Sequence, residues 1–505
     1  MQPPCEAACP AGVKIQDYIS LIAQGRYLEA IAVIRERMPF PSVCGRLCYH
    51  PCEGECNRGL VDEPVAIMYL KRFAADYEFK MRPPLPAPPE VTKPERVAII
   101  GAGLCGLTAA QDLAKMGYPV TLFEALPFPG GTLRWAMLPY RLPGQLVDWD
   151  VQHILALGVE LKTDTTLGKD FSLGHLKAQG YKAIFIATGA NKSRNSSRLS
   201  AEIIAEGALI FGTVWAVHAV GAGHQAAISI DRYLCGEPLA AADTIPIPVV
   251  RRDRAELQEK VLRGQIKLAA RAEMPLWEPL ETTLGFIEME SGYSEEVALR
   301  EALRCLSCGA GAQCLEEKCS ACLTCVRLCP YGAPTITLEG AVTMRLEQCL
   351  ACGICAAECP AGAIFMKGYA VDEISRMIGE KAEAIKGDKP FIFLFTCSYH
   401  TTTREYKDFP ENVIHINLPC IGRIRTIDLL KAFEHGAAGL GVVSCKGGEC
   451  RYLKGDLRIK ERVNYVKGML KEIGFEESKI ELFELDSLSD TEWLNIANLM
   501  LERVS

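Results

Sequence analysis

Two cysteine runs in the middle of the chain constrain its fold more than any other feature. Both have the spacing C-x2-C-x2-C-x3-C-P, and their cysteines are Cys319, Cys322, Cys325, Cys329, Cys349, Cys352, Cys355 and Cys359. In this pattern three closely spaced thiolates hold one [4Fe–4S] cube, and the fourth holds the neighbouring cube. We expect the first three on a tight loop and the fourth at the start of a helix. Zinc ribbons instead pair two C-x2-C units roughly 15–20 residues apart, so the spacing indicates a protein that moves electrons.

Composition narrows the class of protein further. The chain has 505 residues and is 49% hydrophobic, so we expect several cores in roughly three to five modules. Its net charge of −7 argues against nucleic acid as the main partner. An odd count of 23 cysteines in metal-type spacings indicates a reducing, cytoplasmic compartment. The first residues lack the basic and apolar regions of a signal peptide, so none is expected.

The order of sequence features predicts a multidomain α/β protein. Residues 1–82 carry cysteines and apolar residues at helical spacing, which indicates a helical domain with two clusters. The proline-rich run 82–95 should be a stiff, extended linker. The later segments are a single Rossmann-like domain (95–240), an irregular connecting arm (241–300), a bacterial ferredoxin-like domain (301–370) and a parallel α/β domain (388–505).

A glycine-rich turn predicts a dinucleotide site in the Rossmann-like domain. Gly101, Gly103 and Gly106 form G-x-G-x-x-G between a strand and a helix, and Glu124 ends the next strand. Such glycines permit a tight turn and a close backbone approach to a pyrophosphate, while the carboxylate accepts from ribose hydroxyls. The motif does not separate FAD from NAD. Cys105 lies inside the turn, and we interpret it as a small packing residue rather than an activated thiol.

Residues 207–230 contain no charged side chain, so a membrane span has to be considered for them. Its glycines, His218 and His224 suit a buried soluble segment better than a lipid-facing helix. Its GAGHQA pattern (221–226) could pass for a second dinucleotide turn, but the strand and acidic residue that should follow are missing. We therefore expect a helix packed on the Rossmann-like domain.

Residues 1–82 and 95–240 resemble the small subunit of NADPH-dependent glutamate synthase and the matching part of dihydropyrimidine dehydrogenase. The motifs are CEAACP, VCGRLC followed by CEGEC, VAIIGAGLCGLTAA, FPGGTLRWAMLPYRLP and AIFIATGA. The resemblance favours FAD, and the residues that it implies for binding are Gly101, Gly103, Leu104, Cys105, Gly106, Glu124, Gly130, Gly131, Arg134, Thr188 and Gly189. Two departures stand out. There is no room after AIFIATGA for the family's NADPH domain, and the Gly-Asp pair that contacts the flavin ribityl chain is missing.

The same resemblance implies two [4Fe–4S] sites among six N-terminal cysteines, Cys5, Cys9, Cys44, Cys48, Cys52 and Cys56. The family needs a further C-x2-C upstream, which this chain lacks, but EALRCLSCG (301–309) looks like that segment moved behind the flavin domain. Cys305 and Cys308 would then join Cys5 and Cys56 around one cube, and the other four cysteines would hold the second. The alternative is that Cys305, Cys308 and Cys314 are ordinary buried thiols or bind an extra metal. Five four-cysteine sites leave Cys105, Cys235 and Cys314 over.

A last set of cysteines lies in the C-terminal domain. Cys397, Cys420 and Cys445 each end a predicted strand, and Cys450 follows. Ligands gather beyond the carboxyl ends of parallel strands, so the four thiolates should converge at one sheet edge, near the surface. Residues 388–485 resemble the delta subunit of methyl-viologen-reducing hydrogenase through TCSYH, LPCIGRI and VVSCKGGECRY, which implies a [2Fe–2S] adaptor. Zinc is the alternative metal, because four thiolates suit either.

Together these features predict a cytoplasmic electron-transfer subunit of an anaerobic oxidoreductase complex with FAD, four [4Fe–4S] clusters and one [2Fe–2S] cluster. The resemblances imply partner subunits of hydrogenase, formate dehydrogenase or heterodisulfide reductase type, with ferredoxin as a further candidate, and neither nucleic acid nor membrane. Two alternatives stay open: an NAD(P)H-dependent enzyme and a non-catalytic, metal-bound scaffold. Whether the flavin bifurcates electrons is also open, since cluster potentials range over roughly −700 to +450 mV.

Overall fold

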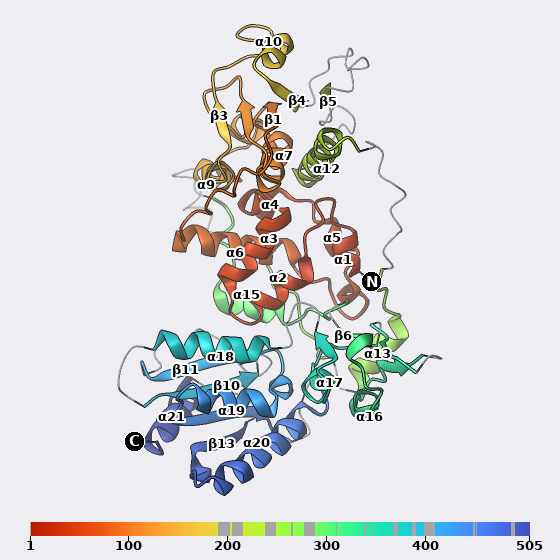
Figure 1. The fold of residues 1–505 in the computed structure, drawn as a ribbon, viewed down its shortest axis with the longest axis vertical. Helices are drawn as coiled ribbons and strands as arrows, with labels where there is room; N and C mark the ends of the chain where they lie inside the picture. The colour runs from red at the N-terminus through yellow and green to blue at the C-terminus, as the bar shows by residue number, and fades with distance from the viewer. Residues whose placement is uncertain are drawn as a thin grey trace.

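The computed structural model shows an elongated molecule with the N-terminal helices in the middle (Figure 1). The described residues are 2–189, 203–204, 216–237, 249–263, 266–276, 288–309, 311–337, 340–346, 348–366, 372–385, 390–397, 410–447, 450, 452–485 and 490–504. One parallel sheet lies at one end of the molecule, and a second lies at the other end beside the ferredoxin-like module. This arrangement agrees with the predicted mixed α/β class.

The N-terminal residues form a helical unit around an apolar core. Its elements are α1 (Pro4–Ala7), α2 (Ile15–Ile22), α3 (Tyr27–Arg37), α4 (Pro41–Leu47), α5 (Pro51–Gly54), η1 (Asn57–Leu60) and α6 (Ile67–Met81). Proline begins α1, α4 and α5, where the missing N–H would have no helical partner. Helix α4 packs directly on α6, because a Cβ on Gly45 would lie only 2.7 Å from Arg72 Cα. Cys44, the cysteine within α4, lies near Lys71 of α6.

The first sheet is parallel, with the order β3-β2-β1-β4-β5. Its strands are β1 (Arg96–Ile100), β2 (Val120–Phe123), β3 (Glu160–Lys162), β4 (Tyr181–Ile186) and β5 (Ile203–Ile204), and its helices are α7 (Leu104–Lys115), α8 (Thr132–Trp135), α9 (Gly144–Leu155) and α10 (Leu173–Ala178). The order reverses between β1 and β4, which is the switch point where open α/β sheets bind ligands. The preceding linker, 82–95, has neither helix nor strand up to Glu95, as predicted.

Helix α12 (Ala216–Leu234) packs along α7 and confirms the interpretation of the GAGHQA pattern. A Cβ on Gly223 would lie 2.6 Å from Cys105 O, so this glycine permits close helix packing. His224 is buried, with Nδ1 2.5 Å from Asp112 Oδ2 and Nε2 2.7 Å from Arg37 O. Residues 207–215 of the uncharged stretch lie outside the described residues.

Among the residues with described structure, no helix combines the length and the apolar character needed to cross a bilayer.

The connecting arm is less irregular than predicted. It contains α13 (Arg254–Leu262) and α15 (Glu295–Ala302), and α15 packs against α2 and α6. The ferredoxin-like module follows, with η2 (Glu316–Lys318), α16 (Thr324–Leu328), α17 (Ile354–Ala357) and two antiparallel pairs, β6 (Ala312–Cys314) with β9 (Ile364–Met366) and β7 (Pro334–Ile336) with β8 (Val342–Met344). The expected helix start at the fourth cysteine is wrong. Cys325 and Cys355, the third cysteines, lie inside α16 and α17, and the fourth follows each helix end.

The C-terminal domain has a parallel sheet, as predicted, in the order β11-β10-β12-β13. Its elements are α18 (Glu373–Ala384), β10 (Ile392–Cys397), β11 (Val413–Leu418), η3 (Ile421–Arg423), α19 (Thr426–Glu434), β12 (Gly439–Cys445), α20 (Gly455–Glu472), η4 (Glu477–Lys479), β13 (Ile480–Leu485) and α21 (Asp490–Glu502). Strand β12 is buried along its length, as expected for a central strand covered on both faces. Ile374 and Ile378 of α18 join the core, so the packed unit begins before residue 388.

Candidate metal centres and dinucleotide site

The glycine-rich turn has the shape that a dinucleotide pyrophosphate requires. Gly101 has φ +109°, and a Cβ there would lie 2.5 Å from Ala187 O. A Cβ on Gly106 would lie 2.0 Å from Gly101 O, so the third glycine lets α7 pack on the strand. A Cβ on Gly103 would meet nothing within 4 Å. The first and third glycines thus serve the turn, and the second leaves open space at the N-terminus of α7, where a phosphate fits.

Glu124 fixes this turn through both carboxylate oxygens. Its Oε2 accepts from Ala102 N at 2.7 Å, and its Oε1 accepts from Leu126 N at 3.0 Å. A carboxylate offers about four acceptor positions, so it can still accept from a ribose hydroxyl. Thr188 and Gly189 are exposed beyond β4, beside Gly101 at the switch point. These positions suit a dinucleotide cofactor.

The loop after β2 closes over the glycine turn. Gly130 N donates to Ala102 O at 2.8 Å, and a Cβ on Gly131 would lie 3.1 Å from Gly103 Cα. Arg134 Nε donates to Pro129 O at 3.1 Å, and its Nη2 is ion-paired with Asp148. Leu104 and Cys105 begin α7, and Cys105 is buried. In this structure Arg134 therefore holds its own loop together.

Set A, defined as Cys9, Cys44, Cys48 and Cys52, lies inside the helical unit. Burial is the largest influence on Cys44 and Cys52, and it raises the pKa of both thiols. The ammonium of Lys71 on α6 comes next and lowers these pKa values, whereas the thiols of Cys9 and Cys48 raise them. His50 N donates to Cys48 Sγ at 3.4 Å. The four sulfurs therefore share one buried site.

Lys71 gives this site a positive charge. The side chain is 8% exposed, and within the described part of the chain it makes no ion pair with a carboxylate. Its charged neighbours are the four thiols of set A. A buried ammonium is costly unless an anion compensates it. Four thiolates around an iron–sulfur cluster are such an anion, so the residues fit the predicted group.

Set B, defined as Cys5, Cys56, Cys305 and Cys308, joins residues from opposite halves of the chain. Burial raises the pKa of Cys5 well above its usual value, and Cys305, Cys56 and Cys308 raise it further, as does Glu6. Burial raises the pKa of Cys56, and the backbone N–H groups of Val65 and Arg58 lower it. Asn57 Nδ2 donates to Cys308 Sγ at 3.3 Å. The structure thus brings the fold-back cysteines to the N-terminal pair that the sequence predicted.

The Cys305–Cys308 loop has the same backbone shape as the two ferredoxin runs. The residue before the second cysteine of each C-x2-C is left-handed: φ is 53° for Ser307, 52° for Ala321 and 56° for Ala351. The residue after that cysteine is left-handed too, namely Gly309, Leu323 and Gly353. Non-glycine residues rarely adopt this region. The shared shape indicates the same kind of cysteine loop in all three places.

A buried network of charged side chains closes set B. Glu301 of α15 accepts from Ala66 N and from Ala272 N, both at 2.8 Å. Arg304 donates from Nη1 to Glu301 at 2.7 Å and from Nη2 to Asp62 at 2.9 Å. Glu301 is 0% exposed and Arg304 is 2% exposed. The returning segment is therefore held on the N-terminal unit by the buried Glu301 and Arg304 together with the partly exposed Asp62.

The ferredoxin-like module contains two further sets, C (Cys319, Cys322, Cys325 and Cys359) and D (Cys329, Cys349, Cys352 and Cys355). Burial raises the pKa of Cys355, and Cys352, Cys349 and Cys329 raise it further. Burial also raises the pKa of Cys325, and its neighbours include Cys322 and Cys359. The fourth cysteine of each run thus lies with the other run, as the spacing predicted. Cys322 is exposed, whereas Cys349, Cys352 and Cys355 are buried.

Set E, defined as Cys397, Cys420, Cys445 and Cys450, lies at the carboxyl edge of the second sheet. Hydrogen bonds from Cys420 and Cys445 lower the pKa of Cys450, and backbone N–H groups of Asp456 and Tyr452 lower it further. A Cβ on Gly455 would lie 2.8 Å from Cys420 Sγ, so the N-terminus of α20 touches these sulfurs. All four thiols are at least nine-tenths buried. The predicted convergence is present, and a position near the surface stays a prediction, with the exposed Lys446 directly after Cys445.

Three cysteines lie outside these sets. Cys314 is beside set C, and burial, followed by a hydrogen bond with Cys319, raises its pKa to about 12. Cys235 is exposed at the end of α12, and Cys105 packs under the glycine turn. Among the described residues, no three His, Cys, Asp or Glu side chains form a site for a single metal ion. A cluster spreads its thiolates over several irons, so sets A to E are compatible with that result.

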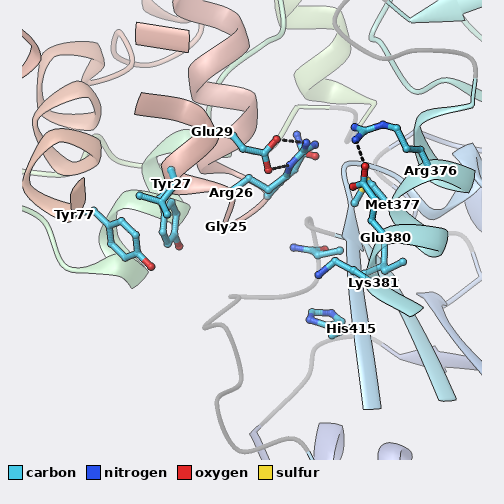
Figure 2. A pocket seen from close by; sticks show the side chains of 14 residues that line it. Gly25, Arg26, Tyr27, Glu29, Tyr77, Arg376, Met377, Glu380, Lys381 and His415 are labelled. Atoms are coloured by element: carbon cyan, nitrogen blue, oxygen red, sulfur yellow. Dashed lines mark hydrogen bonds and ion pairs between the residues drawn. The ribbon is translucent and has the colours of Figure 1, made fainter. Parts of the chain in front are cut away.

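A cavity of about 430 Å³ lies between the helical unit and the C-terminal domain (Figure 2). Arg26 and Tyr27 line one side, and Lys381 of α18 and His415 of β11 line the other. Burial and the nearby Lys381 ammonium lower the pKa of His415 to about 4. The cavity contains none of the cofactor-binding or metal-binding residues predicted from the sequence.

Family models match four segments of the chain. Residues 1–83 match dihydropyrimidine dehydrogenase domain II, a 4Fe-4S cluster domain, and residues 99–160 match an NAD(P)-binding Rossmann-like domain. Residues 318–364 match a 4Fe-4S dicluster domain, and residues 393–505 match the delta subunit of methyl-viologen-reducing hydrogenase. The expected dihydropyrimidine dehydrogenase and hydrogenase resemblances are therefore confirmed, whereas the glutamate synthase assignment stays a prediction.

The chain is also similar to named oxidoreductase subunits over part of its length. It is 46% identical over 193 residues to the NADPH-Fe(3+) oxidoreductase subunit beta of Geobacter sulfurreducens, covering 38% of this chain and 29% of that protein. It is 45% identical over 211 residues to the NADP(+)-dependent formate dehydrogenase subunit beta of Moorella thermoacetica, covering 38% and 30%. A third relative is the PreT homolog of Salmonella typhi, an NAD-dependent dihydropyrimidine dehydrogenase subunit, at 36% identity over 188 residues, covering 37% and 45%. The chain spans less than a third of the first two relatives.

Proposed function

We propose that this chain is a flavin and iron–sulfur electron-transfer subunit of an oxidoreductase complex in the cytoplasm of an anaerobe. The observation that carries the proposal is the grouping of twenty cysteines into five sets, in a chain whose described residues also contain a dinucleotide turn. Oxidoreductase subunits among its relatives support this class of function. In the proposal, FAD occupies the Gly101–Glu124 site, sets A to D hold [4Fe–4S] clusters, and set E holds a [2Fe–2S] cluster.

The burial of the sets suggests where electrons enter and leave. Cys322 of set C is exposed. The two residues before it, Ser320 and Ala321, are exposed too, and Leu323 after it is half-buried. Efficient transfer to another protein needs a short distance through the surface, so we propose set C as the outlet to a soluble acceptor such as ferredoxin. Lys446 and Gly447, also exposed, lie next to set E and offer a second approach for a partner of hydrogenase, formate dehydrogenase or heterodisulfide reductase type.

Chemical analysis of the anaerobically purified protein tests the proposal. Denaturation should release one FAD per chain, and the protein should contain about eighteen irons, from four cubes and one two-iron cluster. A protein without flavin or iron would refute the electron-transfer role and favour the scaffold. A protein with zinc in place of about two irons would refute the proposed [2Fe–2S] cluster in set E alone.

An NAD(P)H-dependent reductase is the second candidate. The NAD(P)-binding Rossmann-like match over residues 99–160 favours it, as do the NADPH- and NADP(+)-dependent relatives. The described chain has one glycine turn of this kind, and one turn serves one dinucleotide. We therefore expect that NADH and NADPH reduce the isolated chain only slowly. Rapid, stoichiometric bleaching of flavin or clusters by either nucleotide would replace the main proposal with this one.

A further inference from the structure

Sets D and E lie against each other at a fixed contact between the ferredoxin-like module and the C-terminal domain. The Cys352 thiol is among the near neighbours of Cys420. Cys352, Leu350 and Ile354 share one apolar cluster with Cys420, Cys445, Cys450 and Tyr452. The contact therefore joins two candidate cluster sites directly.

Two arginines of the C-terminal domain hold this contact in place. Arg423 donates from Nε to Cys352 O at 3.2 Å and from Nη2 to Ala351 O. Arg462 is ion-paired with Glu358 (Nη2–Oε1 2.6 Å), and its Nη1 donates to Gly422 O at 2.9 Å. The Arg462 side chain is 6% exposed, so it is largely shielded from water. Backbone carbonyls beside the ligands thus fix the distance between the sets.

Tyr331 lies at this contact, and its buried hydroxyl makes no hydrogen bond to any residue that the structure describes. It follows Cys329 and Pro330 of set D and packs against the shared apolar cluster. Its neighbours include Cys352 of set D and Cys420 and Cys450 of set E. A buried hydroxyl without a partner is costly, and the sulfur atoms of a bound cluster would supply an acceptor.

We propose that Tyr331 is a positioning residue in an internal electron-transfer junction, where its hydroxyl donates to a sulfur of the clusters held by sets D and E. The inference rests on the proposed function, because it needs both clusters. One electron leaves the reduced cluster on one side and enters the oxidised cluster on the other, while Tyr331 keeps its proton and its electrons. Hydrogen bonds to cluster sulfurs tune the reduction potential. They stabilise the more negative, reduced form and so raise that potential.

The test compares the full-length protein with its Tyr331→Phe variant, which removes the hydroxyl and keeps the ring. Iron and sulfide content should be unchanged. In a potentiometric titration followed by EPR, the midpoint of one cluster should fall by about 59 mV, a tenfold change in its oxidised-to-reduced ratio. Magnetic interaction between the two reduced clusters should persist in the variant. Tyr465→Phe, at an exposed tyrosine of α20, is the matched control and should shift neither midpoint.

Three outcomes would overturn the inference, and they are distinguishable. Unchanged midpoints in Tyr331→Phe would remove the hydroxyl from the junction. Absence of magnetic interaction between the two clusters in the unmodified protein would show that sets D and E are not a junction. Absence of iron from either set in the unmodified protein would refute the proposed function there and the junction with it.

Discussion

Sets A and B are neighbours in the same helical unit but are built in different ways. All four cysteines of set A come from residues 9–52, and the charge beside them is the ammonium of Lys71. Set B takes two cysteines from each half of the chain, and the carboxylate of Glu6 lies beside Cys5. All four cysteines of set A therefore come from the N-terminal unit, whereas set B depends on the return of the segment that contains α15.

The comparison of sets A and B shows how a chain can complete a cysteine site with a segment that is distant in the sequence. Ordering two ends of a long loop costs conformational entropy, so strong interactions must hold the returning segment. Here Glu301, Arg304 and Asp62 form a buried network, and Arg72 and Arg46 bind Glu288 in addition. Set A needs no such clamp.

The largest effect is expected from removing the returning ligands themselves. Changing Cys305→Ala together with Cys308→Ala should abolish the cluster of set B and leave that of set A intact, because the two share no cysteine. Iron analysis should show a loss of about four irons, one cube, and EPR should lose one [4Fe–4S] signal. Cys235→Ala, at an exposed cysteine outside every set, is the control. Full iron content in the double variant would show that set B has other ligands.

Breaking the clamp should give the next largest effect. Arg304→Leu leaves the carboxylate of Glu301 without its buried guanidinium, whereas Asp62 keeps its ion pair with Arg58. Breaking a buried pair costs about 3–5 kcal/mol. Denaturant titration should show this loss, and the iron of set B should be released before that of set A. Arg300→Leu changes an exposed arginine of α15, the helix just before Arg304, and should cost little. Equal stability of the two variants would contradict the clamp.

Much of this architecture could be predicted from the sequence, because its signals are local. The ferredoxin runs, the Gly101–Gly106 turn and the parallel strands each depend on residues close together in the chain. The return of Cys305 and Cys308 could be predicted only through the motif EALRCLSCG. Local spacing does not indicate which distant cysteines meet.

The sequence did not single out two features of the structure. They are the buried charged side chains and the contact between set E and the ferredoxin-like module. Lys71 and Glu301 lie in helices, and Arg304 follows α15. Such charged residues are usually exposed, and only tertiary packing buries these three. Set E was expected near the surface because its cysteines end strands. The ferredoxin-like module packs against it through Arg423 and Cys352, a contact between segments that sequence patterns do not relate. Both features arise from tertiary packing, which local sequence patterns do not indicate.

A smaller effect is expected on the midpoint potentials of the two clusters, because set A has a positive neighbour, Lys71, and set B has a negative one, Glu6. A reduced cluster carries one more negative charge, which the Lys71 ammonium stabilises. Lys71→Met should therefore lower the midpoint potential of set A, by about 59 mV for a tenfold change. Glu6→Gln should instead raise that of set B. EPR-monitored titration of both variants measures this, with Lys80→Met, an exposed lysine of α6, as the control. Shifts of the same sign would contradict the electrostatic contrast.

The smallest difference between sets A and B is expected in their sensitivity to acid, because the carboxylates near them, Glu78 and Asp62, have similarly lowered pKa values. Burial opposes ionisation of Glu78, but hydrogen bonds from His153 and Arg35 lower its pKa to about 2. Burial likewise opposes ionisation of Asp62, and Arg58 lowers its pKa to about 2. Each pKa is below its value of about 4 in the unfolded chain, so the stabilising contribution is complete above pH of about 4 and is lost as the pH falls towards 2.

These two carboxylates should therefore add no pH dependence to stability between pH of about 7 and 5. Urea midpoints of the anaerobic protein should fall only below pH of about 4, where the carboxylates protonate. Glu78→Gln and Asp62→Asn should each lower the midpoint at neutral pH and reduce its decrease in acid, because the amide has no proton to gain. The iron signals of sets A and B should decline over the same acid range. If the iron signal of set B alone declined at pH of about 5, a group other than Asp62 would control the network that holds set B. The different acid sensitivity of sets A and B would then be due to that group.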